Sequence, residues 1–188
     1  MAENRSYDLS REMITLVAEG CDPEKAVLQY AGALEGAEPG KRDQTAQSVF
    51  SDYGRKWADR TIEMGEKYVE RTYEIIKEAA KKTGRLAFPH IPQRFIEIGY
   101  LATQPMEFLN IVVNNHYELI FRVDECATFS GLIDKCGSEV AGEMPCRHAC
   151  ISFCDSIFKA FNMNVDFAAE SLRSKDGYCQ FRAANKGN

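Results

Sequence analysis

The sequence predicts an α+β fold, in which a helical N-terminal half with one long helix precedes a small C-terminal antiparallel sheet crossed by a cysteine-rich helix. The chain has 188 residues, which suits one compact domain. Apolar residues make up 45% and charged residues 27%, as in most proteins with a packed core. Apolar spacing is helical over residues 1–104 and includes strand-like alternation over 105–188. We therefore expect two regions of a single domain.

Two short helices are expected at the start of the chain. Residues 8–18 carry apolar side chains at helical spacing and are followed by Gly20. The run Asp-Pro-Glu over 22–24 then supplies an N-cap, a proline at the first helical position and an acid that suits the helix dipole. This second helix is expected to end by Gly36, before a polar linker over 38–43.

A long helix is expected over 46–83, which contains no proline. Gly54 and Gly65 fall inside it and would allow a bend. Its apolar residues recur at steps of four and seven and form one stripe: Val49, Tyr53, Trp57, Met64, Tyr68, Ile75 and Ala79. The stripe would suit packing within the chain or a homodimer formed through this helix.

The pattern changes to short strands after Pro92. A short helix over 93–102 is followed by two alternating runs, 108–113 and 116–124, on either side of the turn-prone pair Asn114-Asn115. Successive side chains of a strand point to opposite faces. The second strand is therefore apolar on one face and mostly polar on the other, where Glu118 and Arg122 lie.

The C-terminal part is expected to add two helices and a hairpin. A short helix over 128–136 ends at Gly137, and a stronger helix opens at Pro145 and runs to about residue 161. A hairpin then joins strands at 165–171 and 178–182 through a turn that contains Asp176-Gly177.

The helix that opens at Pro145 contains three of the seven cysteines. At about 100° per residue, Cys146, Cys150 and Cys154 fall within an arc of about 80°, so their thiols are expected to face the core. His148 and Asp155 fall on the opposite, polar face. Free cysteine behaves as a small buried hydrophobe, so plain core packing is the first interpretation of these thiols.

A zinc or iron site is a second interpretation. Cysteines four residues apart on a helix can supply a pair of ligands, whereas Cys146 and Cys154 lie about 12 Å apart along the axis. A cysteine from elsewhere would have to join them, and Cys126, Cys150 and Cys154 form the candidate metal set. The two-residue spacing that is typical of zinc knuckles is absent.

A nucleophilic thiol is a third interpretation. Cys146 lies in the expected first turn of its helix, where unpaired N–H groups and the positive helix end lower a thiol pKa from its usual value of about 8.5. Arg147 would act in the same direction. Cys126 is the other candidate nucleophile, since it lies just after the polar strand face that carries Asp124 and Glu118.

The run Phe-Arg-Val-Asp-Glu-Cys over 121–126, the helix with Cys154-Asp155, and Lys-Asp-Gly-Tyr-Cys-Gln-Phe-Arg over 175–182 together resemble the L-2-amino-thiazoline-4-carboxylic acid hydrolase-like family. The resemblance covers roughly residues 106–183. It implies hydrolytic opening of a small cyclic compound at a C–N or C–S bond and singles out Cys126, Cys154 and Asp155. A thiolate would attack an amidine-like carbon while an aspartate handles the proton.

The closing pattern of helix, strand, Asp-Gly turn and strand is also similar to the 4-vinyl reductase domain, a small-molecule-binding module. This similarity implies an alternative function, a non-catalytic sensor that binds a small molecule or a metal. In either case the ligand is expected in a cysteine-lined pocket between helix and sheet. The candidate contacts are Glu118, Arg122, Phe129 and Phe153.

Composition and charge exclude some partners. The chain carries 23 Lys and Arg against 28 Asp and Glu, a net charge of −5, so it lacks the basic surplus that binding to nucleic acid requires. No uncharged apolar run reaches the length of about 18 residues that a membrane span needs, and no secretory signal is evident. An odd number of cysteines favours free thiols. We therefore expect a cytoplasmic protein that binds a small molecule.

Overall fold

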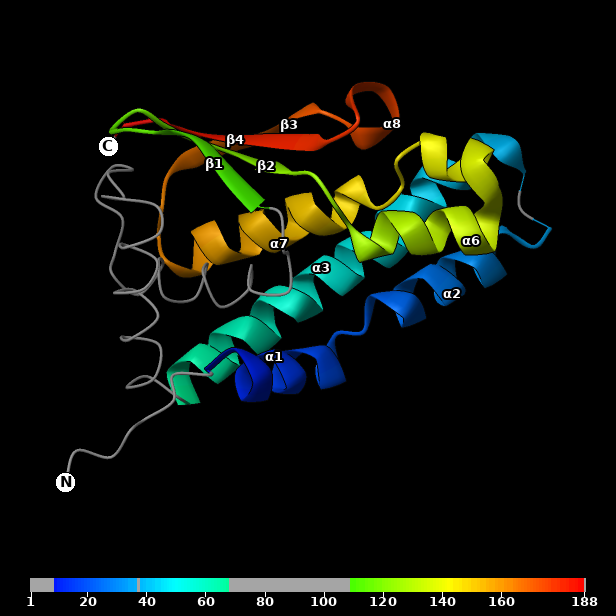
Figure 1. The fold of residues 1–188 in the computed structure, drawn as a ribbon, viewed down its shortest axis with the longest axis horizontal. Coiled ribbons are helices and arrows are strands. Elements are labelled where there is room, and N and C mark those ends of the chain that lie inside the picture. Colours follow the sequence, from blue (N-terminus) through cyan, green and yellow to red (C-terminus); the bar gives the residue numbers. More distant parts are fainter. Residues whose placement is uncertain (1–8, 37, 68–108, 188) are drawn as a thin grey trace.

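The computed structural model describes residues 9–36, 38–67 and 109–187, and these residues adopt the expected α+β architecture (Figure 1). Apart from the short helix between the last two strands, the described helices lie on one side of a four-stranded antiparallel sheet. The elements are α1 (Leu9–Gly20), α2 (Pro23–Leu34), a 3-10 turn (Pro39–Lys41), α3 (Arg42–Lys67), β1 (Leu109–Asn114), β2 (Glu118–Val123), α6 (Ala127–Gly142), α7 (Arg147–Ala160), β3 (Val165–Ser171), α8 (Arg173–Asp176) and β4 (Cys179–Asn185). The helix expected over 93–102 and the continuation of the long helix beyond 67 lie outside the described residues.

The start of α2 confirms the expected capping pattern. The side chain of Asp22 accepts a hydrogen bond from the backbone N–H of Glu24 at 2.9 Å, and Pro23 takes the first helical position. α3 begins at Arg42, four residues earlier than expected, because the turn at Pro39–Lys41 leads directly into it. Asp43 provides an acidic side chain in its first turn, which the helix dipole favours.

α3 and α7 cross in close contact. A Cβ atom at Gly54 would overlap the backbone carbonyl of Ala149, so only glycine permits this approach. The helix runs without interruption from Arg42 to Lys67, and the bend suggested at Gly54 or Gly65 does not occur. Further along the contact, the rings of Trp57 and Phe153 lie 4.0 Å apart.

The apolar stripe of α3 is largely used inside the chain. Val49 and Met64 are buried, and Tyr53 and Trp57 are partly buried against α7 and the core. Packing against α1, α2 and α7 covers these positions. Within residues 42–67 the stripe is therefore not free for the homodimer that the sequence suggested.

The sheet has the strand order β1-β2-β4-β3, and both expected hairpins are present. Phe121 pairs with Phe181 across β2 and β4, and Phe167 of β3 stacks on Phe181 at 5.7 Å. These rings face α7, where Phe158 lies 5.6 Å from Phe167. α7 therefore packs between the sheet and α3, and the cysteine-rich helix lies against the sheet as expected (Figure 1).

Three boundaries in the C-terminal part differ from the prediction. Gly137 has φ 83° and interrupts α6, but the helix then resumes and continues to Gly142 instead of entering a loop. α7 begins at Arg147, since Met144 adopts φ 56° and turns the chain just before Pro145. The expected turn between the last two strands is the short helix α8, which ends at Gly177 with φ 79°.

Candidate functional site

Four cysteines from three segments lie around the place where β2 leads into α6 and where α7 begins. Cys126 is the N-cap residue of α6, Cys146 is the N-cap residue of α7, and Cys150 follows one turn later. Cys179 opens β4, where it pairs with Val123, three residues before Cys126. Cys146 is buried, and Cys179 packs against the same core. We call Cys126, Cys146, Cys150 and Cys179 the thiol cluster.

The thiols of the cluster affect one another electrostatically. Burial raises the pKa of Cys150, and the thiols of Cys126, Cys146, Cys154 and Cys179 raise it further. Burial likewise raises the pKa of Cys146, with added contributions from Cys126 and Cys179. All of these cysteines are free. Cys146 and Cys150 are therefore protonated thiols at neutral pH.

The expected lowering of the Cys146 pKa at a helix end is wrong. Cys146 is only 6% exposed, and desolvation of the thiolate outweighs the favourable effect of the helix terminus and of Arg147. The guanidinium of Arg147 turns away to the carboxylate of Asp43 at 2.5 Å. A buried thiol of this kind is a poor nucleophile, because the thiolate is the reactive form.

Tyr53 of α3 borders the cluster, and the sequence indicated only that it packs. Burial raises the pKa of Tyr53, and the thiols of Cys21, Cys150 and Cys126 contribute in the same direction. Its hydroxyl donates a hydrogen bond to the backbone carbonyl of Cys21 at 3.1 Å. A neutral phenol therefore lies beside the thiols. The helical stripe predicted that Tyr53 packs inside the protein, but no local pattern indicated that cysteines from distant segments lie near it.

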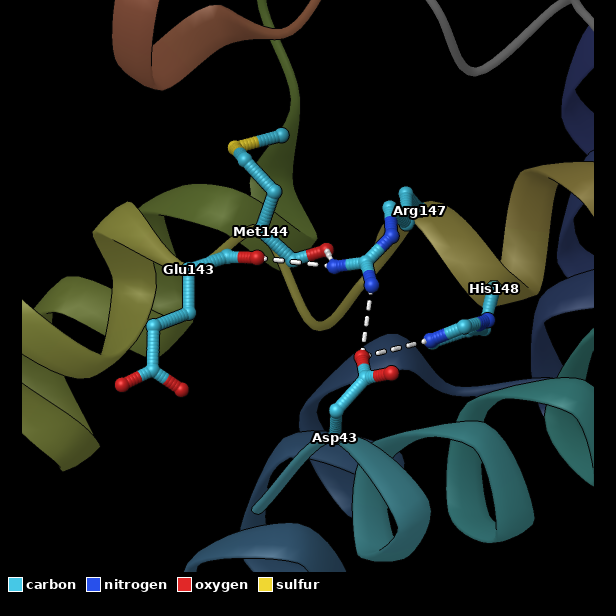
Figure 2. A network of polar contacts seen from close by, with 5 residues as sticks. All are labelled: Asp43, Glu143, Met144, Arg147 and His148. Atoms are coloured by element: carbon cyan, nitrogen blue, oxygen red, sulfur yellow. Dashed lines mark hydrogen bonds and ion pairs between the residues drawn. The ribbon is translucent and has the colours of Figure 1, made fainter. Parts of the chain in front are cut away.

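A polar network fixes the first turn of α7 (Figure 2). One carboxylate oxygen of Asp43 lies 2.5 Å from the guanidinium of Arg147 and 3.1 Å from Nε2 of His148. Arg147 also donates hydrogen bonds to the backbone carbonyls of Glu143 and Met144, at 2.8 and 3.1 Å. The hydrogen bond with His148, together with Arg147, lowers the pKa of Asp43. The network thereby holds the residues on either side of Cys146.

His148 is not on a solvated face, as the helical wheel predicted. Its side chain is 16% exposed, because the start of α3 lies against this side of α7. The pattern of a single helix separates one apolar face from one polar face. It does not reveal that a second helix, with Asp43 in its first turn, covers the polar one.

Glu118 and Arg122 lie on the sheet face opposite α7. Glu118 accepts a hydrogen bond from Arg182 at 2.6 Å, and Arg122 lies 2.8 Å from Asp124 and over the ring of Tyr178. Because strand residues alternate, both side chains point away from the face that carries Phe121. The structure therefore does not bring these two predicted substrate contacts to the thiol cluster.

The two predicted aromatic contacts have different surroundings. Phe129, in the first turn of α6, packs against the core that contains Cys146. Cys179 packs against the same core. Phe153 stacks on Trp57 at 4.0 Å and so belongs to the contact between α7 and α3. Of this pair, Phe129 is the side chain placed beside the thiols.

Cys154 and Asp155 lie further along α7. Cys154 packs between the two groups that contain Phe153 and Phe158, and burial raises its pKa. Asp155 lies on an exposed side of the helix, and partial desolvation raises the pKa of its carboxyl. Asp155 is therefore not positioned to exchange a proton with Cys126.

The described residues do not contain a ready metal centre. Across 9–36, 38–67 and 109–187, no three side chains of His, Cys, Asp or Glu are placed to hold one ion. The candidate set Cys126, Cys150 and Cys154 is thus not a ligand set in this structure. Its members are spread along α7 and the start of α6, too far apart for bonds of about 2.3 Å to a single zinc.

Fold and site define an α+β protein with a partly buried group of thiols at the junction of β2, α6, α7 and β4. Comparison with protein-family models, with curated proteins and with solved structures finds no match. No helix in the described ranges is both long enough and apolar enough to cross a membrane.

Proposed function

We propose that the protein binds a small, partly apolar molecule at the thiol cluster and does not transform it. This is the function implied by the similarity to the 4-vinyl reductase domain. The observation that supports it is that four thiols from three segments lie at the junction of β2, α6, α7 and β4, where Cys146 is buried and Cys179 packs against the same core. The seven free cysteines also suit a reducing cytoplasm.

The chemistry of the cluster suits binding more than catalysis. Protonated thiols are polarizable, weakly polar groups that contact apolar and aromatic molecules well. Phe129 adds an aromatic ring, and the Tyr53 phenol adds a polar atom nearby. Ligand sites are usually mostly apolar, with a few polar groups that orient the ligand. A ligand with an apolar ring and one or two polar atoms matches this set.

Thermal unfolding with indole, benzimidazole and benzothiazole tests the proposal. At least one of them should raise the Tm of the wild-type protein by about 2–4 °C when present well above its Kd. Cys150→Val replaces the thiol with a slightly larger apolar side chain, and should lose most of this shift. Cys136→Val is the matched control, since Cys136 is a partly buried cysteine of α6 outside the cluster. An equal shift in both variants, or none in the wild type, would contradict the proposal.

Hydrolysis is the second candidate function, and the position of Cys126 favours it. Cys126 is partly exposed, has extended backbone geometry and caps α6 without a side-chain hydrogen bond. The resemblance to the hydrolase-like family assigns this residue as a nucleophile. Its thiolate would attack the amidine carbon of a cyclic compound, the C–N bond would break, and water would then release the product.

A direct assay separates the two functions. The protein is incubated with 2-amino-2-thiazoline, and ring opening is followed by mass spectrometry. Turnover that disappears in Cys126→Ser and persists in Cys136→Ser would establish hydrolysis and overturn the binding proposal. We expect no turnover.

A further inference from the structure

Three side-chain nitrogen or oxygen atoms in the described residues are buried without a hydrogen-bond partner. They are the hydroxyl of Tyr30, Nε of Arg122 and Nη1 of Arg173. Arg122 is nevertheless paired, because its Nε lies 2.8 Å from a carboxylate oxygen of Asp124. Tyr30 is neutral, and burial raises its pKa to about 12. Arg173 differs from both, since it is a partly buried, permanent cation whose Nη1 has no acceptor.

Arg173 lies next to the thiol cluster. Its guanidinium carbon is 5.6 Å from the centre of the Phe129 ring, in the first turn of α6. Burial raises the pKa of Cys179, and both the backbone N–H and the guanidinium of Arg173 act in the opposite direction. These effects place Arg173 against α6 on one side and the first residue of β4 on the other.

Across 9–36, 38–67 and 109–187, no carboxylate forms an ion pair with this guanidinium. Asp176 is the acidic residue of the same short helix, and its side chain accepts a hydrogen bond from the backbone N–H of Leu172 at 3.1 Å. No ion pair joins Asp176 to Arg173 within the described residues. Contact with the Phe129 ring stabilises the cation, but a ring face offers no acceptor for the buried Nη1.

A guanidinium presents its donors in a planar fork that matches paired oxygens. We propose that Arg173 is an anion-binding residue of this site, and that it holds an oxyanion group of the small molecule bound at the thiol cluster. This inference deepens the proposed function and rests on it for the apolar part of the ligand. The predicted ligand class is therefore a small anion with an apolar body and a carboxylate, phosphate or sulfate group.

Thermal unfolding in sodium acetate, sulfate or inorganic phosphate, against sodium chloride at equal ionic strength, tests the assignment. At least one oxyanion should raise the wild-type Tm by about 2–4 °C relative to chloride. Arg173→Gln should lose this shift, and Arg173→Lys should keep only part of it, because lysine retains the charge but not the fork. Arg182→Gln is the control, since Arg182 is already paired with Glu118 on the other face of the sheet.

A second measurement does not depend on the stability of the variants. Phenylglyoxal modifies arginine side chains, and its reaction at each arginine can be followed by mass spectrometry. The oxyanion that raises Tm should slow modification of Arg173 in the wild-type protein at least fivefold and leave Arg182 unaffected.

The outcomes distinguish this inference from the proposed function. No oxyanion effect beyond that of chloride in either measurement, or an unchanged shift in Arg173→Gln, would overturn it, and Arg173 would then only pack on Phe129. If oxyanions bind through Arg173 while the neutral probes fail to bind, the anion site stands and the proposed function falls. If neutral probes bind at Cys150 and oxyanions do not bind, the proposed function stands and the assignment of Arg173 as an anion-binding residue falls.

Discussion

Gly54 sets how closely the two central helices approach. A side chain there would collide with the carbonyl of Ala149, on the neighbouring helix. In the sequence, Gly54 suggested a bend, since glycine weakens a helix by about 1 kcal/mol relative to alanine. The missing side chain was thus visible from the sequence. The close contact that requires it could not be predicted, because Ala149, the residue that lies against Gly54, is 95 positions away in the sequence.

Gly54→Ala should destabilise the protein by about 2–3 kcal/mol, because the new methyl group forces α3 and α7 apart. Gly32→Ala is the control in α2, where a Cβ atom would meet open space. This change should be neutral or stabilising by up to about 1 kcal/mol. Urea denaturation measures both free energies of unfolding. Equal effects at the two positions would show that Gly54 does not mark a close contact.

The burial of Cys146 could be predicted from nearby residues, whereas its pKa could not. The helical wheel indicated that Cys146 faces the core, and the residue is buried. The pKa of Cys146 was expected to fall because the sequence places this thiol at the positive end of a helix, which is a local feature. Desolvation acts in the opposite direction and depends on everything packed around the thiol, so the structure reverses the prediction.

The first turns of α3 and α7 are joined by the network around Asp43. Its partners Arg147 and His148 are more than 100 positions away in the sequence. The contact lies beside the corner at Met144, where the chain adopts a backbone conformation that is rare for residues other than glycine. We infer that the network helps to keep this corner, and with it the thiols of α7, in place.

Asp43→Asn should therefore destabilise the protein, but by less than about 1 kcal/mol, because the Asp43 side chain is 66% exposed. The folded state lowers the pKa of Asp43, so its contribution is present above the ordinary value of about 3.9 and is lost as the pH falls through the lower folded value. The stability difference between wild type and variant should thus be full at pH 5 and shrink toward pH 3.

Chemical denaturation at several pH values between 3 and 5 measures this difference. Asp59→Asn is the control, since Asp59 is an exposed carboxylate of the same helix. A difference for Asp43→Asn that stays constant down to pH 3 would contradict the role assigned to the ionised carboxylate.

The helices and strands were predicted best where local signals are strong. The capping pattern at Asp22 and the turn at Asn114-Asn115 depend on neighbouring residues alone, and both elements appear as expected. The extension of α6 beyond Gly137 was missed. A glycine with positive φ normally ends a helix, whereas the buried residues Val140 and Ala141 hold a further turn in place by tertiary packing.

Across the molecule, α7 is the element that both halves share. It packs on α3 through Ala149 and Phe153, and on the sheet through Phe158. Neither the helical half nor the sheet can therefore lose its contacts without exposing a face of α7. This arrangement favours cooperative unfolding of the two regions together.

Two probes test this cooperativity in one urea titration. Fluorescence of Trp57, the only tryptophan, reports on the contact between α3 and α7. Alkylation of Cys179 by iodoacetamide, read by mass spectrometry, reports on the junction of the sheet with the helices. The two midpoints should coincide. Labelling of Cys179 at clearly lower urea would show that the sheet opens on its own.

The sequence by itself determined the fold class, the order of most helices and strands, and the separation of each into an apolar and a polar face. These properties follow from periodicity, capping and turn residues, which act between close neighbours in the chain. Only the tertiary structure decided which faces meet. It placed Cys126, Cys146, Cys150 and Cys179 together, and it turned Glu118 and Arg122 away from them. Such placements depend on contacts between distant segments, and no local pattern records them.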